Sequence, residues 1–130
     1  MKLNLLSDVS SQALTAALEG AAARQAALAD NIANVDTPGF VRSEVDFEKA
    51  LATALDQARR APSSLAQGLP ALSLRKSKDF ASPARVDGNN VNIDREMAAL
   101  SRNALSYRAA GELLGARIRG LRAAINSSRR

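Results

Sequence analysis

At residues 31–40 the chain reads Asn31-Ile-Ala-Asn-Val-Asp-Thr-Pro-Gly-Phe40, which stops one helical pattern and starts a tight turn. Proline disfavours helical geometry in the residue before it, so Thr37 is expected to be extended. Pro38 and Gly39 suit the two central positions of a type II turn, whose second residue needs a positive φ. Asn34 is placed to cap the helix, because asparagine tolerates left-handed geometry. The segment therefore predicts a fixed change of chain direction.

Upstream of this segment, residues 8–35 have the spacing of one helix, with Ser7 as a candidate N-cap and Asp8 in the first turn. Apolar residues recur at alternating intervals of four and three, which is typical of a coiled-coil seam about three heptads long. The candidate interface positions are Leu14, Leu18, Ala21, Leu28, Ile32 and Val35. The N-terminal helix is therefore expected to pack along one side against a partner helix.

The C-terminal part of the chain carries a longer pattern of the same kind. Asn92 is a candidate N-cap, followed by Asp94 and Glu96 where the helix dipole favours negative charge. The candidate interface positions are Ile93, Met97, Leu100, Ala104, Tyr107, Gly111, Leu114, Ile118, Leu121 and Ile125. Such a sustained repeat favours a coiled coil. Ala104 and Gly111 would let a partner backbone approach closely, although Gly111 could also be only a weak position costing about 1 kcal/mol of helix propensity.

Between these helices the period of the sequence changes. Residues 41–48 alternate apolar and charged side chains, which indicates a short extended stretch with one charged face. Residues 47–58 return to helical spacing, with Asp46 as a candidate cap and an end near Arg60. Residues 61–85 contain three prolines and keep no period, so we expect a mobile or weakly ordered segment in which residues 72–74 could form a short strand.

These patterns predict a mainly α fold, in which long N- and C-terminal helices pair as a coiled-coil-like bundle beside a small irregular, β-containing central region. We expect a terminal helical domain of residues 1–35 and 93–130, a turn, short strand and short helix at 36–60, and a flexible central segment at 61–92. One pair of thin helices buries only part of each surface, so the ends should gain order by packing against copies or relatives. A head-to-tail contact of that kind closes into a ring or extends as a filament.

The composition excludes several kinds of active site. The chain has no Cys and no His, which removes thiolate and imidazole zinc sites, Cys nucleophiles and Ser-His-Asp triads. Carboxylates two positions apart, such as Asp94 and Glu96, do not face each other on a helix. We therefore predict no catalytic, metal-binding or cofactor-binding residues and no enzyme activity. No apolar run is long enough to span a membrane, and the N-terminus lacks the apolar core of a cleavable signal.

The net charge of +5 is concentrated near the C-terminus, where residues 93–130 carry eight basic and three acidic side chains. Such a bias suggests a solvated helix face, a nucleic-acid partner or an acidic membrane surface. The arginines spread around the last helix, and aromatic residues make up only 3% of the chain. Stacking on nucleic acid and anchoring at a membrane both use aromatic side chains, so a solvated face is favoured. Nucleic-acid binding remains the alternative function.

Two motifs resemble those of a known family. Residues Leu28-Ala-Asp-Asn-Ile-Ala-Asn-Val-Asp-Thr-Pro-Gly-Phe40 resemble the N-terminal signature of bacterial flagellar axial proteins, which are the rod, hook and hook-associated subunits. The sequence Val91-Asn-Ile-Asp-Arg-Glu-Met97, with Tyr107 ten residues on, resembles the C-terminal helix motif of that family. A chain this short is similar to the subunits of the proximal rod. The signature residues are Asn31, Asn34, Thr37, Pro38, Gly39 and Phe40.

The resemblance implies a structural subunit of the basal-body rod, exported by the flagellar type III apparatus without a cleaved signal peptide and assembled in the periplasm. The implied partners are copies of the chain, other rod subunits, the adaptor between membrane ring and rod, and export-gate proteins. No nucleic acid, small-molecule substrate or cofactor is implied. Phe47 and Leu51 resemble a short export-gate motif, although a helix core pair at i and i+4 is the simpler explanation. Asn31 and Asn34 could bond carbonyls of a neighbouring helix or subunit.

Overall fold

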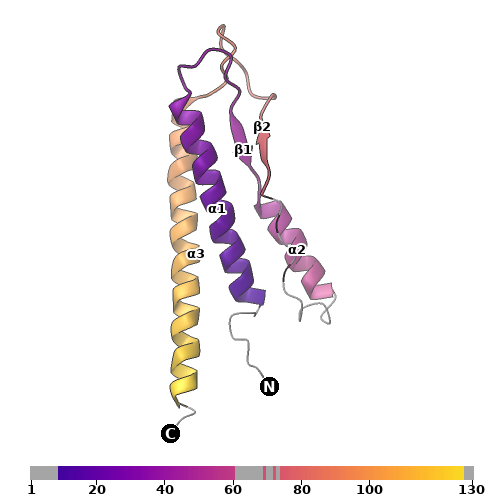
Figure 1. Ribbon diagram of the computed structural model, residues 1–130, viewed down its shortest axis with the longest axis vertical. Helices are drawn as coiled ribbons and strands as arrows, with labels where there is room; N and C mark the ends of the chain where they lie inside the picture. Colours follow the sequence, from indigo (N-terminus) through magenta and orange to yellow (C-terminus); the bar gives the residue numbers. More distant parts are fainter. Residues whose placement is uncertain (1–8, 61–68, 70–71, 73, 128–130) are drawn as a thin grey trace.

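The computed structural model describes residues 9–60, 69, 72 and 74–127. Within these ranges the elements are α1 (Val9–Ala33), β1 (Ser43–Val45), α2 (Glu48–Arg60), β2 (Lys76–Lys78) and α3 (Ile93–Ser127). α1 and α3 lie side by side along the length of the molecule, and the two strands and α2 lie on the other side of α1 (Figure 1). The predicted mainly α fold with paired terminal helices and a small β-containing centre is confirmed.

α1 and α3 run antiparallel, and polar contacts along their length fix their relative position. These contacts join Asn31 to Glu96 (2.9 Å), the Ala21 carbonyl to Asn103 (2.9 Å) and Ser11 to Arg117 (3.2 Å). Residues seven apart on a helix lie on one face, so the three α3 residues share a face with the buried Ala110. This heptad position of α3 is therefore the one that packs on α1.

The intramolecular face of α3 differs from the predicted apolar repeat. Its buried residues are Glu96, Asn103 and Ala110. Of the predicted positions, Leu100, Gly111, Leu114, Ile118 and Leu121 are partly buried, whereas Ile93, Met97, Ala104, Tyr107 and Ile125 are exposed. The apolar repeat did not predict this face, because α3 contacts α1 through polar side chains, Glu96 and Asn103, at a different heptad position. The role of the exposed positions in contacts between subunits stays a prediction.

Phe47 packs directly onto the α1 backbone at Gly20. A Cβ atom on Gly20 would lie only 2.3 Å from the Phe47 ring, which is 5% exposed. The Arg24 guanidinium lies over the same ring at 4.7 Å from its centroid, a cation–π geometry. Arg24 also donates from Nε to the Val45 carbonyl (3.0 Å) and forms an ion pair with Glu48. These contacts seat the start of α2 against α1.

The close approach at Gly20 predicts that Gly20→Ala destabilises the chain, although alanine is the better helix former. Overpacking costs about 1–3 kcal/mol. This cost is at least as large as the roughly 1 kcal/mol gained in helix propensity. Urea denaturation followed by circular dichroism measures the effect. Gly111→Ala is the matched control, because a Cβ there meets no atom within 4 Å. Equal shifts of the two variants in the same direction would contradict the packing at Gly20.

The two strands pair antiparallel, with Ser43 opposite Lys78 and Val45 opposite Lys76. The extended stretch predicted within residues 41–48 is confirmed at residues 43–45. The second strand lies at residues 76–78 rather than at 72–74, because its lysines tolerate the exposed edge of a small sheet. Within the predicted charged face Arg42 is only 5% exposed, whereas Glu44, Asp46 and Glu48 are exposed.

The helix boundaries agree with the capping signals in part. Asn92 is confirmed as the N-cap of α3, since its Oδ1 accepts from the Arg95 backbone N–H (3.0 Å). α2 begins at Glu48, and the Phe47 carbonyl accepts its first helical hydrogen bond, so Phe47 rather than Asp46 is the N-cap. α1 ends two residues before the predicted residue 35.

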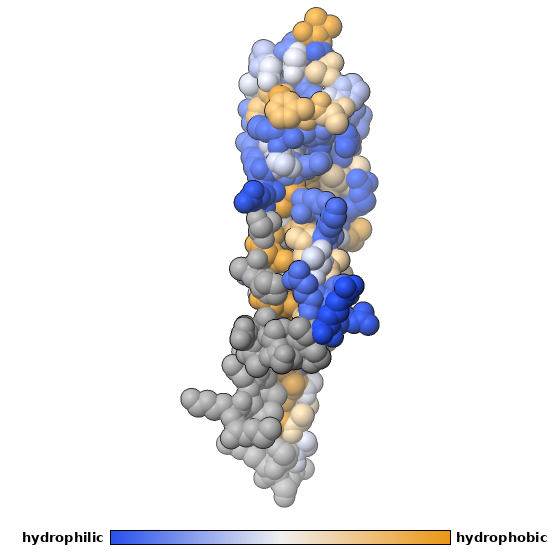
Figure 2. All heavy atoms as spheres, turned by 90° about the vertical axis from the view of Figure 1, so that its right-hand side faces the viewer, coloured by the Kyte–Doolittle hydropathy of each residue, from blue (hydrophilic) through white to orange (hydrophobic). Residues whose placement is uncertain are grey.

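Several other sequence predictions fall on residues that the structure leaves undescribed. The candidate N-cap at Ser7, with Asp8, is one of them, and so is part of the segment expected to be weakly ordered, at 61–68, 70–71 and 73. In the described ranges, no helix has an apolar stretch sufficient to cross a bilayer. Seen from the side of β2 and α2, hydrophilic side chains cover most of the described surface, with separate hydrophobic patches between them (Figure 2).

Candidate functional site

Asn31, the first residue of the turn segment, joins three elements with its side chain. Its Nδ2 donates to the Ser43 carbonyl (2.7 Å) and to Glu96 Oε2 (2.9 Å), while its Oδ1 accepts from the Ser43 N–H (2.8 Å). Asn31 is fully buried, so these partners replace the water that the amide would bind when exposed. The amide thus bonds a neighbouring strand and helix of the same chain, and fixes the end of α1 against β1 and α3.

Arg42 is the centre of a buried ion-pair cluster next to Asn31. Its Nε donates to Glu96 Oε1 (2.7 Å), and its Nη1 donates to Asp79 (2.5 Å) and Glu44 (3.2 Å). Glu96 has no exposed surface, and its two oxygens are shared between Arg42 and Asn31. Removal of one partner would leave a buried charge, which is far more costly than the net worth of the pair. The cluster therefore specifies one geometry for β1, β2 and α3.

The charges of this cluster shift the pKa values of its members. Burial alone would lower the pKa of Arg42, but hydrogen bonds to Glu96 and Asp79 outweigh burial and raise it, so the guanidinium stays charged. Hydrogen bonds from Ser82 and Arg42 hold the pKa of Asp79 well below its ordinary value. The charges of the cluster are therefore paired with one another. Within the described ranges, no group of three or more acidic side chains is placed to hold a metal ion.

Acid is expected to destabilise the fold through these carboxylates. The pKa of Asp79 lies below its ordinary 3.8, and Lys76 and Arg24 likewise lower the pKa values of Asp30 and Glu48. A carboxyl with a depressed folded pKa stabilises the fold above its unfolded pKa, and this contribution disappears as the pH falls through the folded value. Thermal unfolding should show midpoints that fall progressively below about pH 4. Asp79→Asn should flatten this dependence, and a midpoint that rises on acidification would contradict it.

Asn89, which lies shortly before α3 in the sequence, bonds the chain just after the end of α1. Its Nδ2 lies within hydrogen-bond distance of the carbonyls of Asn34 (2.9 Å), Val35 (3.1 Å) and Thr37 (2.8 Å). Its Oδ1 accepts from the Val91 N–H (2.7 Å), and the side chain is fully buried. A helix end leaves carbonyls without intrahelical donors. The residues just before α3 therefore supply the donors that close the turn segment.

Asn34 contributes to the same helix end in a different way from the one predicted. Its Nδ2 donates to the Asp30 carbonyl within its own helix (2.8 Å), and its Oδ1 accepts from Thr37 Oγ1 (3.1 Å). Among the described non-glycine residues none has a positive φ, so Asn34 is not left-handed. The left-handed cap expected at Asn34 is absent, and the carbonyls of Asp30, Asn31 and Ile32 instead accept from the backbone N–H groups of Asn34 and Val35.

The type II turn is confirmed, and a second turn faces it. Gly39 has φ +70°, and the Phe40 N–H donates to the Thr37 carbonyl (3.2 Å). The Gly39 N–H in turn donates to the Asp87 carbonyl (2.8 Å). Gly88 has φ +80°, and a Cβ on it would lie 3.3 Å from the Gly39 Cα. Two glycines with positive φ thus allow the two loops to touch.

The predicted signature residues and the segment before α3 therefore meet in one place, here termed the corner (residues 31–43 and 85–96). Asn31 lies in its core, Asn34 and Phe40 are half-buried, and Thr37, Pro38 and Gly39 are exposed. Lys78 lies over the Phe40 ring at 4.6 Å from its centroid. Sequence reasoning missed Arg42, Asp79 and Asn90, although Asn90 Oδ1 accepts from the Arg42 N–H (2.7 Å). The only available signal was a run of asparagines after a turn.

Most of the other predicted site residues lie outside the corner, and only Ile32, Val35 and Ile93 fall within it. In the N-terminal repeat, Ala21 and Leu28 are buried, and Leu14, Leu18, Ile32 and Val35 are half-buried. The two residues of the export-like motif also differ in exposure. Phe47 is buried against Gly20, and Leu51 is half-buried. Phe47 is thus a core residue of the folded chain. The corner offers hydrogen bonds and ion pairs within the chain, which is the chemistry of an architectural joint.

Comparisons with known proteins identify the family. The family profile described as flagella basal body rod protein matches residues 12–40. FlgB, the flagellar basal body rod protein, of Borrelia hermsii is 43% identical over 96 residues, which cover 65% of this chain and 71% of that protein. FlgB of Yersinia ruckeri is 33% identical over 116 residues, covering 81% and 85%. FlgB of Escherichia coli is 34% identical over 116 residues, covering 81% and 84%. The chain therefore belongs to the FlgB family of flagellar basal body rod proteins.

Proposed function

We propose that this chain, a structural subunit of the flagellar basal body rod, assembles by packing its terminal helices against those of neighbouring subunits. The observation that carries the proposal is a row of exposed apolar side chains along α3. Ile93, Met97 and Tyr107 belong to the unbroken apolar repeat, yet they are 41%, 48% and 47% exposed. Contiguous exposed apolar surface marks an interaction site. Copies of the chain and related rod subunits are the partners that would cover this row.

A second apolar row on α3 supports the same arrangement. Leu105 and Leu113 are 67% and 59% exposed, and they lie off the face that packs on α1. A helix that is apolar on several sides is typical of an element enclosed by neighbours. α1 covers only one side of α3, so other subunits must supply the remaining contacts. Contacts between unlike faces extend as a helical filament when the rotation does not close.

The finer placement of the subunit rests on the family resemblance. The chain belongs in the proximal rod, in the periplasm, between the membrane ring with its export gate and the distal rod. It reaches that place through the flagellar type III apparatus without a cleaved signal peptide, and it contacts the rod-to-ring adaptor and export-gate proteins there. Because Phe47 is buried, an export signal at Phe47 and Leu51 could be bound only before the chain folds.

The parts of the chain divide the work in this proposal. Residues 1–35 and 93–130 form the assembling helical domain, residues 36–60 form the turn, the short strand and the short helix, and the described residues of the central segment 61–92 supply β2 and one half of the corner. The subunit has no catalytic role and uses no cofactor. Nothing in the fold or in the family supports the alternative of a nucleic-acid-binding protein.

Substitutions at two partly buried positions that continue the apolar repeat of α3 should block assembly. Gly111→Leu places a bulky side chain at a small position of that repeat, and Leu114→Asp places a charge in it. Both are expected to abolish swimming in a flagellated host that lacks its own copy of the gene, and to leave the chain out of isolated basal bodies.

Gln57→Leu is the matched control for this experiment. It adds the same leucine at an exposed position of α2, away from both apolar rows of α3. This variant should swim normally. Circular dichroism of the purified Gly111→Leu chain separates an assembly defect from a folding defect. Normal swimming of both Gly111→Leu and Leu114→Asp would overturn the assignment of this interface.

A further inference from the structure

A groove of about 360 Å³ lies between α1 and α3, about halfway along α1. Ala21 and Ala22 line it from α1, and Ala104 lines it from α3, beside the longer side chains of Tyr107 and Arg108. The clefts beside β1 and at the corner are instead lined mainly by charged and amide side chains. Three alanines therefore leave room in this groove for a bulky apolar group.

The groove is continuous with the apolar row of α3 that is proposed to meet other subunits. Tyr107 belongs to that row, and Ala104 lies three positions before it on the same face of the helix. Tyr107 is 47% exposed, and within the described ranges no hydrogen bond or ion pair engages the Arg108 guanidinium. An aromatic ring packs well on a tyrosine ring and also attracts a guanidinium over its face. The groove therefore favours an aromatic occupant.

Phe80 is the aromatic side chain that the fold leaves outside. Of the three phenylalanines, Phe47 is 5% exposed and Phe40 is half-buried, whereas Phe80 is 80% exposed. Burial of an aromatic side chain removes about 150–250 Å² from water, and aromatic residues are frequent anchors of protein interfaces. Because the ring of Phe80 is outside the core of its own chain, it is available to a neighbouring subunit.

The backbone around Phe80 is held in a fixed position. The Asp79 carboxylate accepts from Arg42 Nη1 (2.5 Å) and from the Ala81 N–H (2.9 Å). The Asp79 carbonyl accepts from Asn90 Nδ2 (2.6 Å), and the Asp79 N–H donates to the Arg42 carbonyl (3.0 Å). A side chain that an ordered backbone presents has less conformational freedom to lose on binding. The ion-pair cluster therefore prepares Phe80 for a contact.

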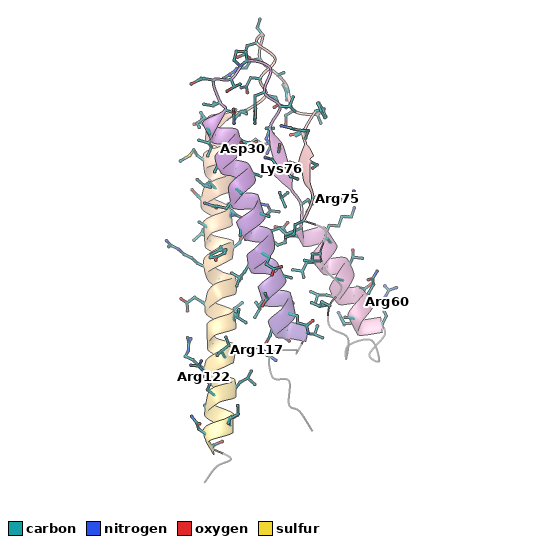
Figure 3. The ribbon with its side chains drawn as sticks, in the orientation of Figure 1. Asp30, Arg60, Arg75, Lys76, Arg117 and Arg122 are labelled. Carbon is teal, nitrogen blue, oxygen red and sulfur yellow. The ribbon has the colours of Figure 1, made fainter. Side chains whose placement is uncertain are left out.

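Phe80 cannot reach the groove of its own chain. Lys76 pairs with Asp30 (2.5 Å), which places β2 beside the last part of α1 (Figure 3). Phe80 follows β2 toward the corner, whereas Ala21 lies nine residues before Asp30, about 14 Å back along α1. The groove can therefore receive Phe80 only from another copy that is displaced along the helix axis.

We propose that the groove between α1 and α3 receives Phe80 of a second copy, whose ring packs on Ala104 and Tyr107 and beneath Arg108. A side chain that enters a pocket elsewhere on the same kind of molecule joins unlike surfaces, and such contacts extend a filament when they do not close. One ring buries far less than the roughly 1,200–2,000 Å² of a stable interface, so the free chain should stay monomeric. The inference rests on the proposed assembly of copies and names one contact within it.

Thiol cross-linking in assembled rods tests this contact, because the natural chain has no cysteine. A flagellated host that lacks its own copy would produce an Ala81→Cys chain, which keeps Phe80, together with a longer, tagged Ala104→Cys chain. A short bis-maleimide should give several-fold more mixed dimer in isolated basal bodies than it gives when the tagged chain carries Ala109→Cys. Ala109 is the matched control, because it is an exposed alanine of α3 that does not line the groove.

The outcomes separate the contact from the function. If another kind of rod subunit or only water covers the groove, the mixed dimer does not exceed the Ala109→Cys control. That result would overturn the contact and leave the chain a rod subunit. Absence of the unsubstituted chain from basal bodies would instead overturn the proposed function.

An exchange of side-chain volume across the contact is the second test. Phe80→Ala leaves the groove empty and Ala104→Phe fills it in advance, so each should reduce the swimming rate several-fold. The double variant returns one ring to the groove and should recover most of the swimming rate. A double variant that swims no better than the poorer single variant would contradict the contact. Circular dichroism of the purified chains should show an unchanged fold, because both positions are exposed.

Discussion

Glu96→Ala is expected to lower the free energy of unfolding by about 3–5 kcal/mol. The substitution removes the acceptors of two buried groups at once, the Arg42 Nε and the Asn31 Nδ2. Arg42 is only 5% exposed, so its Nε loses its acceptor in a buried place, while its Nη1 keeps Asp79 and Glu44. Because small domains are stable by only about 5–15 kcal/mol, a loss of this size unfolds a large fraction of the chain under mild conditions.

Urea denaturation of the purified chain measures this loss. Glu112→Ala is the control, since it removes an exposed carboxylate from the same helix and should change stability by less than about 0.5 kcal/mol. Exchange of both buried partners for apolar residues, in Arg42→Met with Glu96→Leu, should recover part of the loss, because neither Glu96 nor Arg42 is left as an unpaired buried charge, although Asp79 loses Arg42. If Glu96→Ala and Glu112→Ala had equal effects, Arg42 would not depend on Glu96.

Asn89→Ala is expected to loosen the chain after α1, at a cost of about 1–3 kcal/mol. It removes one of the donors to the carbonyls of Asn34, Val35 and Thr37, and it leaves the buried Val91 N–H without its acceptor. Amide exchange should show a loss of protection around residues 31–37. These residues lie more than fifty positions before Asn89 in the sequence, yet they are bonded to it. Asn34→Ala is the matched comparison, because its amide donates only within its own turn of helix, to Asp30.

The order of the two effects decides where the cap comes from. If Asn89 supplies it, Asn89→Ala must cost more than Asn34→Ala and must loosen α1 specifically. A larger effect of Asn34→Ala, with residues 31–37 still protected in Asn89→Ala, would show that the turn segment closes by itself. The C-terminal motif would then be a neighbour of the corner and not its support.

Local signals in the sequence predicted the elements that local chemistry determines. The turn at Pro38 and Gly39 and the N-cap at Asn92 depend on residues within three positions of each other, and both are confirmed. The long helices followed from sustained apolar spacing. The alternation around residue 43 correctly predicted a strand, because side chains of a strand point to opposite faces.

The contacts that close the corner could not be predicted in the same way. A charged residue in an alternating stretch is normally solvated, so the alternation gave no sign that Arg42 is buried. Its burial depends on Glu96 and Asp79, which are 54 and 37 positions away. Likewise, the face of α3 that meets α1 is marked by Glu96 and Asn103, which an apolar repeat passes over. The family resemblance singled out both motifs, but it gave no sign that they bond to each other.

A density map of isolated basal bodies at side-chain resolution would test the assembly most directly. We expect α1 and α3 of one chain to remain paired as in the free subunit, with Met97 and Tyr107 buried against neighbouring rod subunits. A rod in which this row of α3 faces open solvent, or in which α1 pairs with the α3 of another copy, would contradict the proposed packing.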